Sequence, residues 1–212
     1  MKPIEEKLLL NGPAGKIEVI AENPGAPRGI ALVAHPHPIG GGANTNKVAY
    51  TLARTFLALG YAAYRPNFRG VGLSEGAHDD GEGETDDLLF VLEEAKRRCG
   101  DLPVALAGFS FGAYCQTKVA ERLAAAGHPA QRLVLVGTAA GFVEGTRHYQ
   151  TAAVPADTIV IHGSADETVP LANLLAWAQP LDLPVVVVPG ADHFFHRRLH
   201  LIRDIVTRAW RH

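Results

Sequence analysis

Short, continuously apolar runs alternate with longer amphipathic segments along most of this chain. The run GIALVAHP at residues 29–36 ends at a proline, which is typical of a strand buried on both faces of a sheet. The segment at residues 44–60 instead repeats its apolar residues three and four positions apart and ends at Gly60. That spacing predicts a helix with one buried face, and Asn44 is the expected residue at its N-cap.

The same two patterns recur through the sequence and predict an α/β architecture. Strands are expected at residues 4–10, 17–22, 29–36, 61–68, 103–110, 132–137, 158–163 and 184–190, and helices at 44–60, 84–98, 111–127, 169–179 and 194–210. Strands that alternate with helices imply right-handed crossovers, so we expect a mostly parallel, twisted sheet with helices on both faces. The first two strands, joined by the turn-rich sequence NGPAG, add an antiparallel edge.

Composition narrows the class of protein. The 212 residues fit a single domain spanning residues 1–212, and 47% of them are hydrophobic. The formal net charge is −2, which argues against nucleic acid as a partner because such proteins usually carry a basic stripe. No apolar run approaches the roughly 18–20 residues of a membrane span. The two cysteines are too few for a disulfide framework, so a cytoplasmic location is expected.

The strongest chemical motif lies where the predicted strand at residues 103–110 meets a predicted helix. The sequence Gly108-Phe109-Ser110-Phe111-Gly112 matches G-x-S-x-G in the strand–turn–helix context that this motif requires. Such a turn exposes the serine hydroxyl above the sheet at a helix N-terminus, where N–H groups favour a developing negative charge. The pattern also occurs by chance, but its context favours Ser110 as a nucleophile.

A serine nucleophile needs a base, and the base needs an orienting carboxylate. Asp166 follows one predicted strand and His193 follows the next, so the chain order Ser110, Asp166, His193 is that of α/β-hydrolases. The preceding strand, which ends at Gly137, has no acid directly after it, and this favours Asp166. A helix cap is the alternative role for Asp166, and Asp192 is interpreted as a turn residue.

The second requirement of acyl transfer is an oxyanion hole, for which backbone N–H groups are needed. The motif assigns one to Phe111 and the other to the loop at residues 35–42. Pro36 and Pro38 have no N–H, so His37 is the favoured donor, although the segment also fits a plain glycine-rich turn. His35 is expected to hold this loop through backbone hydrogen bonds. The expected substrate-binding residues are Ile39, Gly40, Phe142 and Phe194.

Histidines and acidic residues are the remaining candidates for chemistry. His193, His196 and His200 have the spacing i, i+3 and i+7 that can place three side chains on one helical face, but no obvious fourth ligand accompanies them, so no metal is expected. Residues 75–87 hold seven acids whose spacing does not fit a calcium loop. They are interpreted as a solvated loop whose last acids favour a helix N-terminus, with Arg65 and Arg69 as nearby partners. His162 is expected in or near the core, Cys99 and Cys115 as packing residues, and His78, His128, His148 and His212 in loops or at the surface.

Five stretches together resemble a known family. They are HPHPIGGGANTNKV, RPNFRGVGLSEGAHDDGEGETDD, GFSFGA, VIHGSADETVP and PGADHFFHRRL, and they span residues 35–199. The chain resembles the small, lid-less α/β-hydrolases of the serine esterase superfamily that are related to dienelactone hydrolase. The resemblance implies a triad of Ser110, Asp166 and His193 and hydrolysis without a metal or organic cofactor. Dienelactone hydrolase itself uses a cysteine, so its lactone substrates are not implied here.

These observations predict a serine hydrolase that cleaves small acyl esters or thioesters through an acyl-enzyme. A scaffold that binds a ligand or partner without catalysis, and an acyltransferase with the same triad, remain alternatives. The connection at residues 138–157 is too short for a helical lid, so the site is expected to be open. The acyl-chain preference and the choice between monomer and homodimer stay open.

Overall fold

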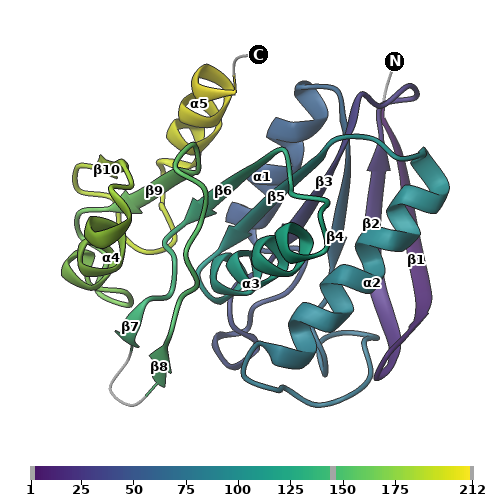
Figure 1. Cartoon of the computed structure of the whole chain (residues 1–212), viewed down its shortest axis with the longest axis horizontal. Helices are drawn as coiled ribbons and strands as arrows, with labels where there is room; N and C mark the ends of the chain where they lie inside the picture. Colours follow the sequence, from purple (N-terminus) through teal and green to yellow (C-terminus); the bar gives the residue numbers. More distant parts are fainter. Residues whose placement is uncertain (1–2, 144–146, 211–212) are drawn as a thin grey trace.

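The computed structural model describes residues 3–143 and 147–210, and an eight-stranded sheet runs through it (Figure 1). Its strand order is β1-β2-β4-β3-β5-β6-β9-β10. The strands are β1 (Ile4–Gly12), β2 (Gly15–Asn23), β3 (Gly29–Ala34), β4 (Tyr61–Pro66), β5 (Val104–Phe109), β6 (Arg132–Val136), β9 (Ile159–Gly163) and β10 (Val185–Val188). β1 and β2 pair antiparallel and β2 pairs antiparallel with β4, whereas the pairs from β4 to β10 are parallel. The predicted α/β-hydrolase sheet with an antiparallel N-terminal edge is confirmed.

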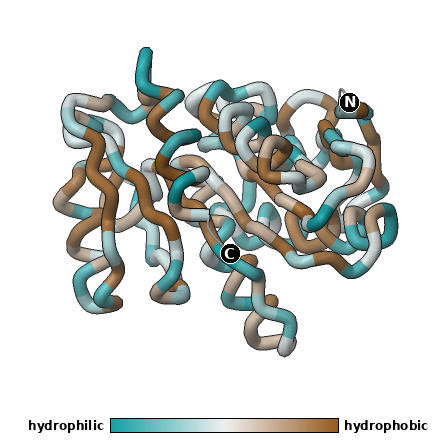
Figure 2. The backbone as a smooth tube through the Cα atoms, turned by 90° about the horizontal axis from the view of Figure 1, so that it is seen from above, coloured by the Kyte–Doolittle hydropathy of each residue, from teal (hydrophilic) through white to brown (hydrophobic). Residues whose placement is uncertain are grey.

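Helices cover both faces of this sheet, as Figure 1 shows. α1 (Lys47–Ala58) and α5 (Leu199–Ala209) pack on one face, while α2 (Glu82–Cys99) and α3 (Phe111–Ala125) pack on the other. α4 (Leu171–Ala178) packs against β9, and a 3-10 turn, η2 (Gln179–Leu181), follows it. In Figure 2, apolar stretches of the chain run through the middle of the molecule, and many of the outer turns are hydrophilic.

The strand side chains alternate between two hydrophobic clusters. In β3, Ile30 and Leu32 join the cluster under α2 and α3, while Ala31 and Val33 join the cluster under α1 and α5. All four are fully buried. A strand between two helical layers buries both of its faces, which explains why its sequence reads as a continuous apolar run.

Two helix boundaries differ from the prediction because of local backbone chemistry. α1 is capped by Asn46, whose Oδ1 accepts hydrogen bonds from two N–H groups of the first turn, and the expected cap, Asn44, is buried and donates its N–H to Asn67 instead. α5 begins at Leu199 rather than at residue 194. The preceding residues form turns in which Phe195 and Arg197 adopt positive φ, a conformation that a right-handed helix excludes.

The connection between β6 and β9 forms a small two-stranded sheet in place of a lid. β7 (Gly141–Val143) and β8 (Arg147–Tyr149) pair antiparallel, and residues 138–143 and 147–158 contain no helix. This confirms the expected lack of a helical lid for the part of the connection that the structure describes. Within residues 3–143 and 147–210, no helix combines the length and the apolar character needed to cross a membrane.

The interpretation of residues 75–87 as a solvated loop is wrong for two of the carboxylates, because the structure buries them. Glu84 is completely buried and Asp87 is 4% exposed. α2 already begins at Glu82, and Asp87 is the partner of Arg69, with Nε and Oδ2 2.7 Å apart. Arg65 does not pair with this segment but with Glu22 of β2, at 2.9 Å.

Outside this segment, the cysteines and minor histidines lie largely where they were expected. Cys115 is fully buried, and Cys99 is partly buried against the Tyr64 hydroxyl. His128 and His148 are exposed, and His212 lies outside the described residues.

Candidate functional site

Ser110 occupies a sharp turn between β5 and α3. Its φ is +57°, an uncommon value for a residue with a side chain, and it is the last residue before the helix. A Cβ at Gly108 would lie 2.5 Å from the carbonyl oxygen of Gly112, and a Cβ at Gly112 would lie 2.4 Å from that of His35. Only glycine fits at these two positions, so the G-x-S-x-G pattern is required by the close approach of the two elements.

A continuous chain of polar contacts joins Ser110 to two later loops. His193 Nε2 lies 3.0 Å from Ser110 Oγ, and His193 Nδ1 lies 2.7 Å from Asp166 Oδ2. All three residues are buried, with 5–7% of each exposed. They follow β5, β9 and β10, whose carboxyl ends meet at the same edge of the sheet. The structure therefore brings together the three residues that the sequence singled out.

Asp166 uses its two carboxylate oxygens for different tasks. Oδ1 accepts hydrogen bonds from the N–H groups of Thr168 and Val169, while Oδ2 contacts His193. The turn-capping role and the role toward His193 therefore coexist. Asp192 is turned away from this contact and accepts the N–H of His196 on Oδ1, as expected for a turn residue.

The loop after β3 lies directly beside the start of α3. His37 caps a 3-10 turn, η1 (Pro38–Gly40), in which its Nδ1 accepts the Ile39 N–H at 3.1 Å. The His37 and Phe111 rings pack with centroids 4.8 Å apart. Burial lowers the pKa of His37 to about 4, and the electrostatic effects of the neighbouring His78 and Arg147 lower it further. His37 is therefore neutral at pH 7, which suits an imidazole that accepts a hydrogen bond.

His35 ties this loop to the end of β4, as the sequence predicts. Its Nε2 accepts the Phe68 N–H at 2.9 Å, and its Nδ1 lies 2.7 Å from the carbonyl oxygen of Pro36. Burial lowers the pKa of His35 to about 4, against the opposing effect of the Pro36 carbonyl. A neutral ring that donates from Nδ1 and accepts at Nε2 satisfies both contacts.

The model of a protein family that is described as serine aminopeptidase S33 matches residues 25–153, which are more than half of the chain. The chain belongs to this serine hydrolase family. An α-β serine hydrolase homologue from Coxiella burnetii is 36% identical to it, with 97% of each chain covered and a TM-score of 0.85. A serine hydrolase without a lid from Xanthomonas campestris is 34% identical, over 97% of this chain and 93% of that one, also with a TM-score of 0.85.

Two further comparisons give a relative of similar sequence and a protein of the same fold. An uncharacterized protein of Rickettsia prowazekii is 32% identical over 200 residues, which cover 89% of this hydrolase and 82% of that protein. A dienelactone hydrolase from Anabaena variabilis is 17% identical with a TM-score of 0.75, over 99% of this chain and 98% of that one, and shares the fold.

A cavity of about 240 Å³ opens above Ser110 of the hydrolase. Of the four expected substrate-binding residues, Ile39, Gly40 and Phe194 line this cavity. Phe142 is 65% exposed and packs on His148, and its strand neighbour Val143 lines the cavity instead. Residues on a strand alternate sides, so the β7–β8 pairing decides which of the two neighbours faces inward.

Residues that the sequence reasoning missed also line the cavity. Arg147 and Tyr149 of β8 line it together with Asn46 and Thr168, and none of the described lining residues is an aspartate or glutamate. Burial raises the pKa of Tyr149 to about 12, partly opposed by Arg147, so its hydroxyl stays protonated at neutral pH. No motif marks Arg147, because the hairpin that brings it to the site is specified by tertiary packing.

His162 is a further buried histidine of the hydrolase and lies next to Asp166. Its Nε2 lies 2.9 Å from the Val169 carbonyl oxygen and 3.5 Å from Asp166 Oδ2. Burial lowers its pKa, so the ring is neutral and donates from Nε2 to that carbonyl. The expected place of His162 near the site is confirmed.

The histidines predicted to share a helix face are separated by the turns before α5. His196 precedes the helix, and its side chain is 68% exposed. In the part of the chain that the structure describes, no group of three or more histidine, cysteine or acidic side chains is arranged to hold a metal ion.

Proposed function

We propose that this protein hydrolyses small acyl esters, with Ser110 as nucleophile, His193 as general base and Asp166 as the group that orients the imidazole. The observation that carries the proposal is the unbroken chain of contacts from Asp166 Oδ2 through both ring nitrogens to Ser110 Oγ, at 2.7 and 3.0 Å. Both distances lie within hydrogen-bond reach for proton transfer. The strained turn of Ser110 has the form of a nucleophile elbow.

The acylation step follows from this geometry. Ser110 Oγ forms a bond to the ester carbonyl carbon while its proton moves to His193 Nε2. The imidazolium is stabilised by Asp166, which is fixed by two backbone N–H groups and so does not need to reorganise. The carbon–oxygen bond to the alcohol then breaks, and the alcohol leaves with the proton from His193. Water repeats the sequence on the acyl-enzyme and releases the acid.

The negative charge of the tetrahedral intermediate needs two backbone donors. We assign them to the N–H groups of Phe111 and His37, which lie on the two elements that meet beside Ser110. The N-terminus of α3 adds its own favourable field at this point. Such preorganised donors are usually the largest single contribution to catalysis of acyl transfer.

The charge of the cavity favours an ester over an aminopeptidase substrate. A peptide with a free N-terminus carries a positive charge, which a binding site has to neutralise with acidic groups. None of the lining residues that the structure describes is acidic. The cavity is also small, about 240 Å³, which suits a short acyl group.

A labelling and turnover experiment tests the proposal. The protein is incubated with a fluorophosphonate probe and with p-nitrophenyl esters of two to eight acyl carbons, alongside Ser110→Ala and an aminoacyl p-nitroanilide. We expect labelling of Ser110, turnover of the short esters, loss of both in Ser110→Ala and little cleavage of the anilide. Absence of labelling and of ester turnover above the Ser110→Ala background would refute the proposal.

The same experiment separates the two alternatives. An acyltransferase would release the p-nitrophenol at a rate that rises with an added alcohol acceptor and would form a new ester. A non-catalytic scaffold would bind a ligand equally well with and without the Ser110 hydroxyl, and neither form would be labelled.

A further inference from the structure

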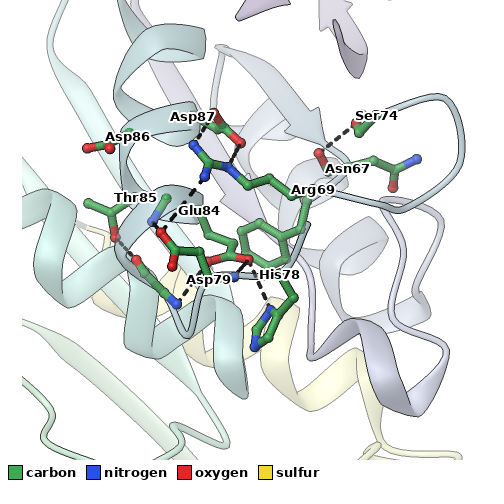
Figure 3. Close-up of polar contacts among 12 residues, drawn as sticks. Asn67, Arg69, Ser74, His78, Asp79, Glu84, Thr85, Asp86 and Asp87 are labelled. Carbon is green, nitrogen blue, oxygen red and sulfur yellow. Dashed lines mark hydrogen bonds and ion pairs between the residues drawn. The ribbon is translucent and has the colours of Figure 1, made fainter. Parts of the chain in front are cut away.

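Glu84 is a buried carboxylate that the proposed mechanism does not use. It lies in the first turn of α2 and none of its surface is exposed. Its Oε1 accepts the Asp79 N–H at 3.0 Å and its Oε2 accepts the Gly81 N–H at 2.8 Å. His78 Nδ1 lies 3.0 Å from Oε1, without the geometry of a hydrogen bond, and Figure 3 shows the imidazole beside this carboxylate. The carboxylate is thus fixed by the backbone on one side and faces a titratable ring on the other.

The ring of His78 connects this carboxylate to the proposed oxyanion hole. Its centroid lies 4.6 Å from that of His37 and 5.2 Å from that of Phe111, and these two rings are 4.8 Å apart. The three rings therefore form a triangle, and two of its members carry the N–H groups assigned to the oxyanion. The side chain of His78 is 26% exposed, so its position was not evident from a sequence that reads as a surface loop.

We propose that Glu84 and His78 are a positioning pair for the oxyanion hole, an inference that rests on the proposed function. The buried carboxylate packs closely against the imidazole of His78, and the imidazole packs on the rings of His37 and Phe111 so that their N–H groups keep their place. Neither residue touches the substrate. A displacement of about 1 Å at a reacting centre costs about 100-fold in rate, so a second layer that fixes these donors acts on catalysis rather than on binding.

A purely structural role for Glu84 is the competing explanation. Its contact with the Gly81 N–H is part of the cap of α2, and loss of that contact lowers stability whatever happens at the active site. The two roles differ in what they change. A cap alone changes the unfolding free energy, whereas a positioning pair changes kcat at a constant KM in protein that remains folded.

The neighbourhood offers two matched controls. Asp80 Oδ1 lies 3.3 Å from His78 Nε2 on the other edge of the ring, but its side chain is fully exposed. The ion pair of Arg69 with Asp87 fixes the same loop to the same helix, as Figure 3 shows, and neither of its residues has a ring contact with His37 or Phe111. Asp80→Asn therefore removes a charge beside His78 Nε2 but keeps a polar side chain there, and Asp87→Asn alters the attachment of the loop at a residue without a contact to these rings.

The test compares Glu84→Gln, His78→Ala and His78→Phe with these controls and with the wild type, on a short p-nitrophenyl ester. We expect kcat to fall about 10- to 100-fold in Glu84→Gln and His78→Ala with KM within about 2-fold, because loss of one oxyanion donor alone costs about 100- to 1,000-fold. His78→Phe keeps the ring but loses the carboxylate contact, and we expect an intermediate kcat. The rate of labelling by the fluorophosphonate should fall in parallel, since its tetrahedral adduct needs the same donors. Asp80→Asn and Asp87→Asn should keep kcat within about 3-fold.

The outcomes that overturn the pair differ from those that overturn the esterase proposal. The positioning role would be refuted if folded His78→Ala kept the kcat of the wild type, or if Asp87→Asn lost as much kcat as Glu84→Gln. Turnover that depends on Ser110 would be unaffected by either result. Wild-type kcat in His78→Phe together with loss in His78→Ala would remove Glu84 from the proposal. If neither the wild type nor any variant hydrolyses the ester, the NMR chemical shifts of backbone amides test the positioning role instead. The positioning role then requires the His37 and Phe111 amides to shift in Glu84→Gln and not in Asp80→Asn.

Discussion

At the scale of single residues, the site depends on groups that are fixed before any substrate arrives. Asp166 divides its two oxygens between the backbone and His193, and His35 and His37 are held neutral by burial. These assignments follow from hydrogen bonds and desolvation, which act over a few ångströms. Substitutions at this scale are therefore expected to have separable effects on turnover and on stability.

Asp166→Asn is expected to lower kcat by about 1,000- to 10,000-fold while KM changes little, because an amide no longer stabilises the imidazolium and favours the wrong tautomer of His193. Steady-state kinetics on a short ester measure this effect. Asp192→Asn is the matched control, since Asp192 adjoins His193 in sequence but contacts His196. Equal losses in the two variants would contradict the assignment of Asp166 as the orienting acid.

Stability is expected to fall as the pH drops from about 6.5 to about 4, partly through His35. The folded protein holds the pKa of this ring at about 4, below its ordinary value of 6.5. The unfolded chain therefore takes up a proton first, so the contribution is complete above pH 6.5 and is lost toward pH 4, to the extent of about 3 kcal/mol for His35.

Urea unfolding at pH 7, 5.5 and 4.5 measures this loss. His35→Asn should be less stable at pH 7 and should show a flatter pH dependence, while the exposed His128→Gln should follow the wild type. A His35→Asn profile as steep as that of the wild type would show that another group causes the loss.

At the scale of elements, the closest approaches of backbone decide the site. β3, β5 and α3 meet so tightly that a Cβ on Gly108 or Gly112 would overlap carbonyl oxygens. The same approach places the His35–His37 loop against Phe111. The boundaries of α5 and α1 were mispredicted because turns with positive φ and a second asparagine are local details that apolar periodicity does not register.

Gly112→Ala is expected to destabilise the protein by about 3 kcal/mol or more, since its Cβ would lie 2.4–2.6 Å from backbone atoms of β3 and the residue after it. Thermal and urea unfolding measure the change. Gly40→Ala is the control, because a Cβ there has open space within 4 Å, and it should change stability by about 0.5 kcal/mol or less. Equal stability of the two variants would show that β3 and α3 can separate at little cost.

At the scale of the whole molecule, the connection between β6 and β9 sets access to the site. The described part of this connection forms the β7–β8 pair, and Val143, Arg147 and Tyr149 from that pair line the cavity. The chain thus uses a short hairpin as a wall of the site.

We expect ester hydrolysis to follow a simple hyperbola through the solubility limit of the substrate, because the described connection contains no helical lid that an interface would open. Initial rates on p-nitrophenyl butyrate and octanoate, measured below and above the limit, test this. A sharp rise in rate when droplets appear would contradict it, and a catalytically dead Ser110→Ala sample corrects for spontaneous hydrolysis.

The sequence by itself determined the sheet, its antiparallel edge and the order of Ser110, Asp166 and His193. Buried parallel strands read as continuous apolar runs, and the carboxyl ends of such strands converge whatever the details of their loops. Only the tertiary structure decided that Val143 rather than Phe142 lines the cavity, that Arg147 lines it as well, and that Glu84 and His78 lie beside the proposed oxyanion hole. These contacts join segments far apart in the chain, and their residue types are also the ordinary residues of solvated loops, so local pattern could not distinguish them.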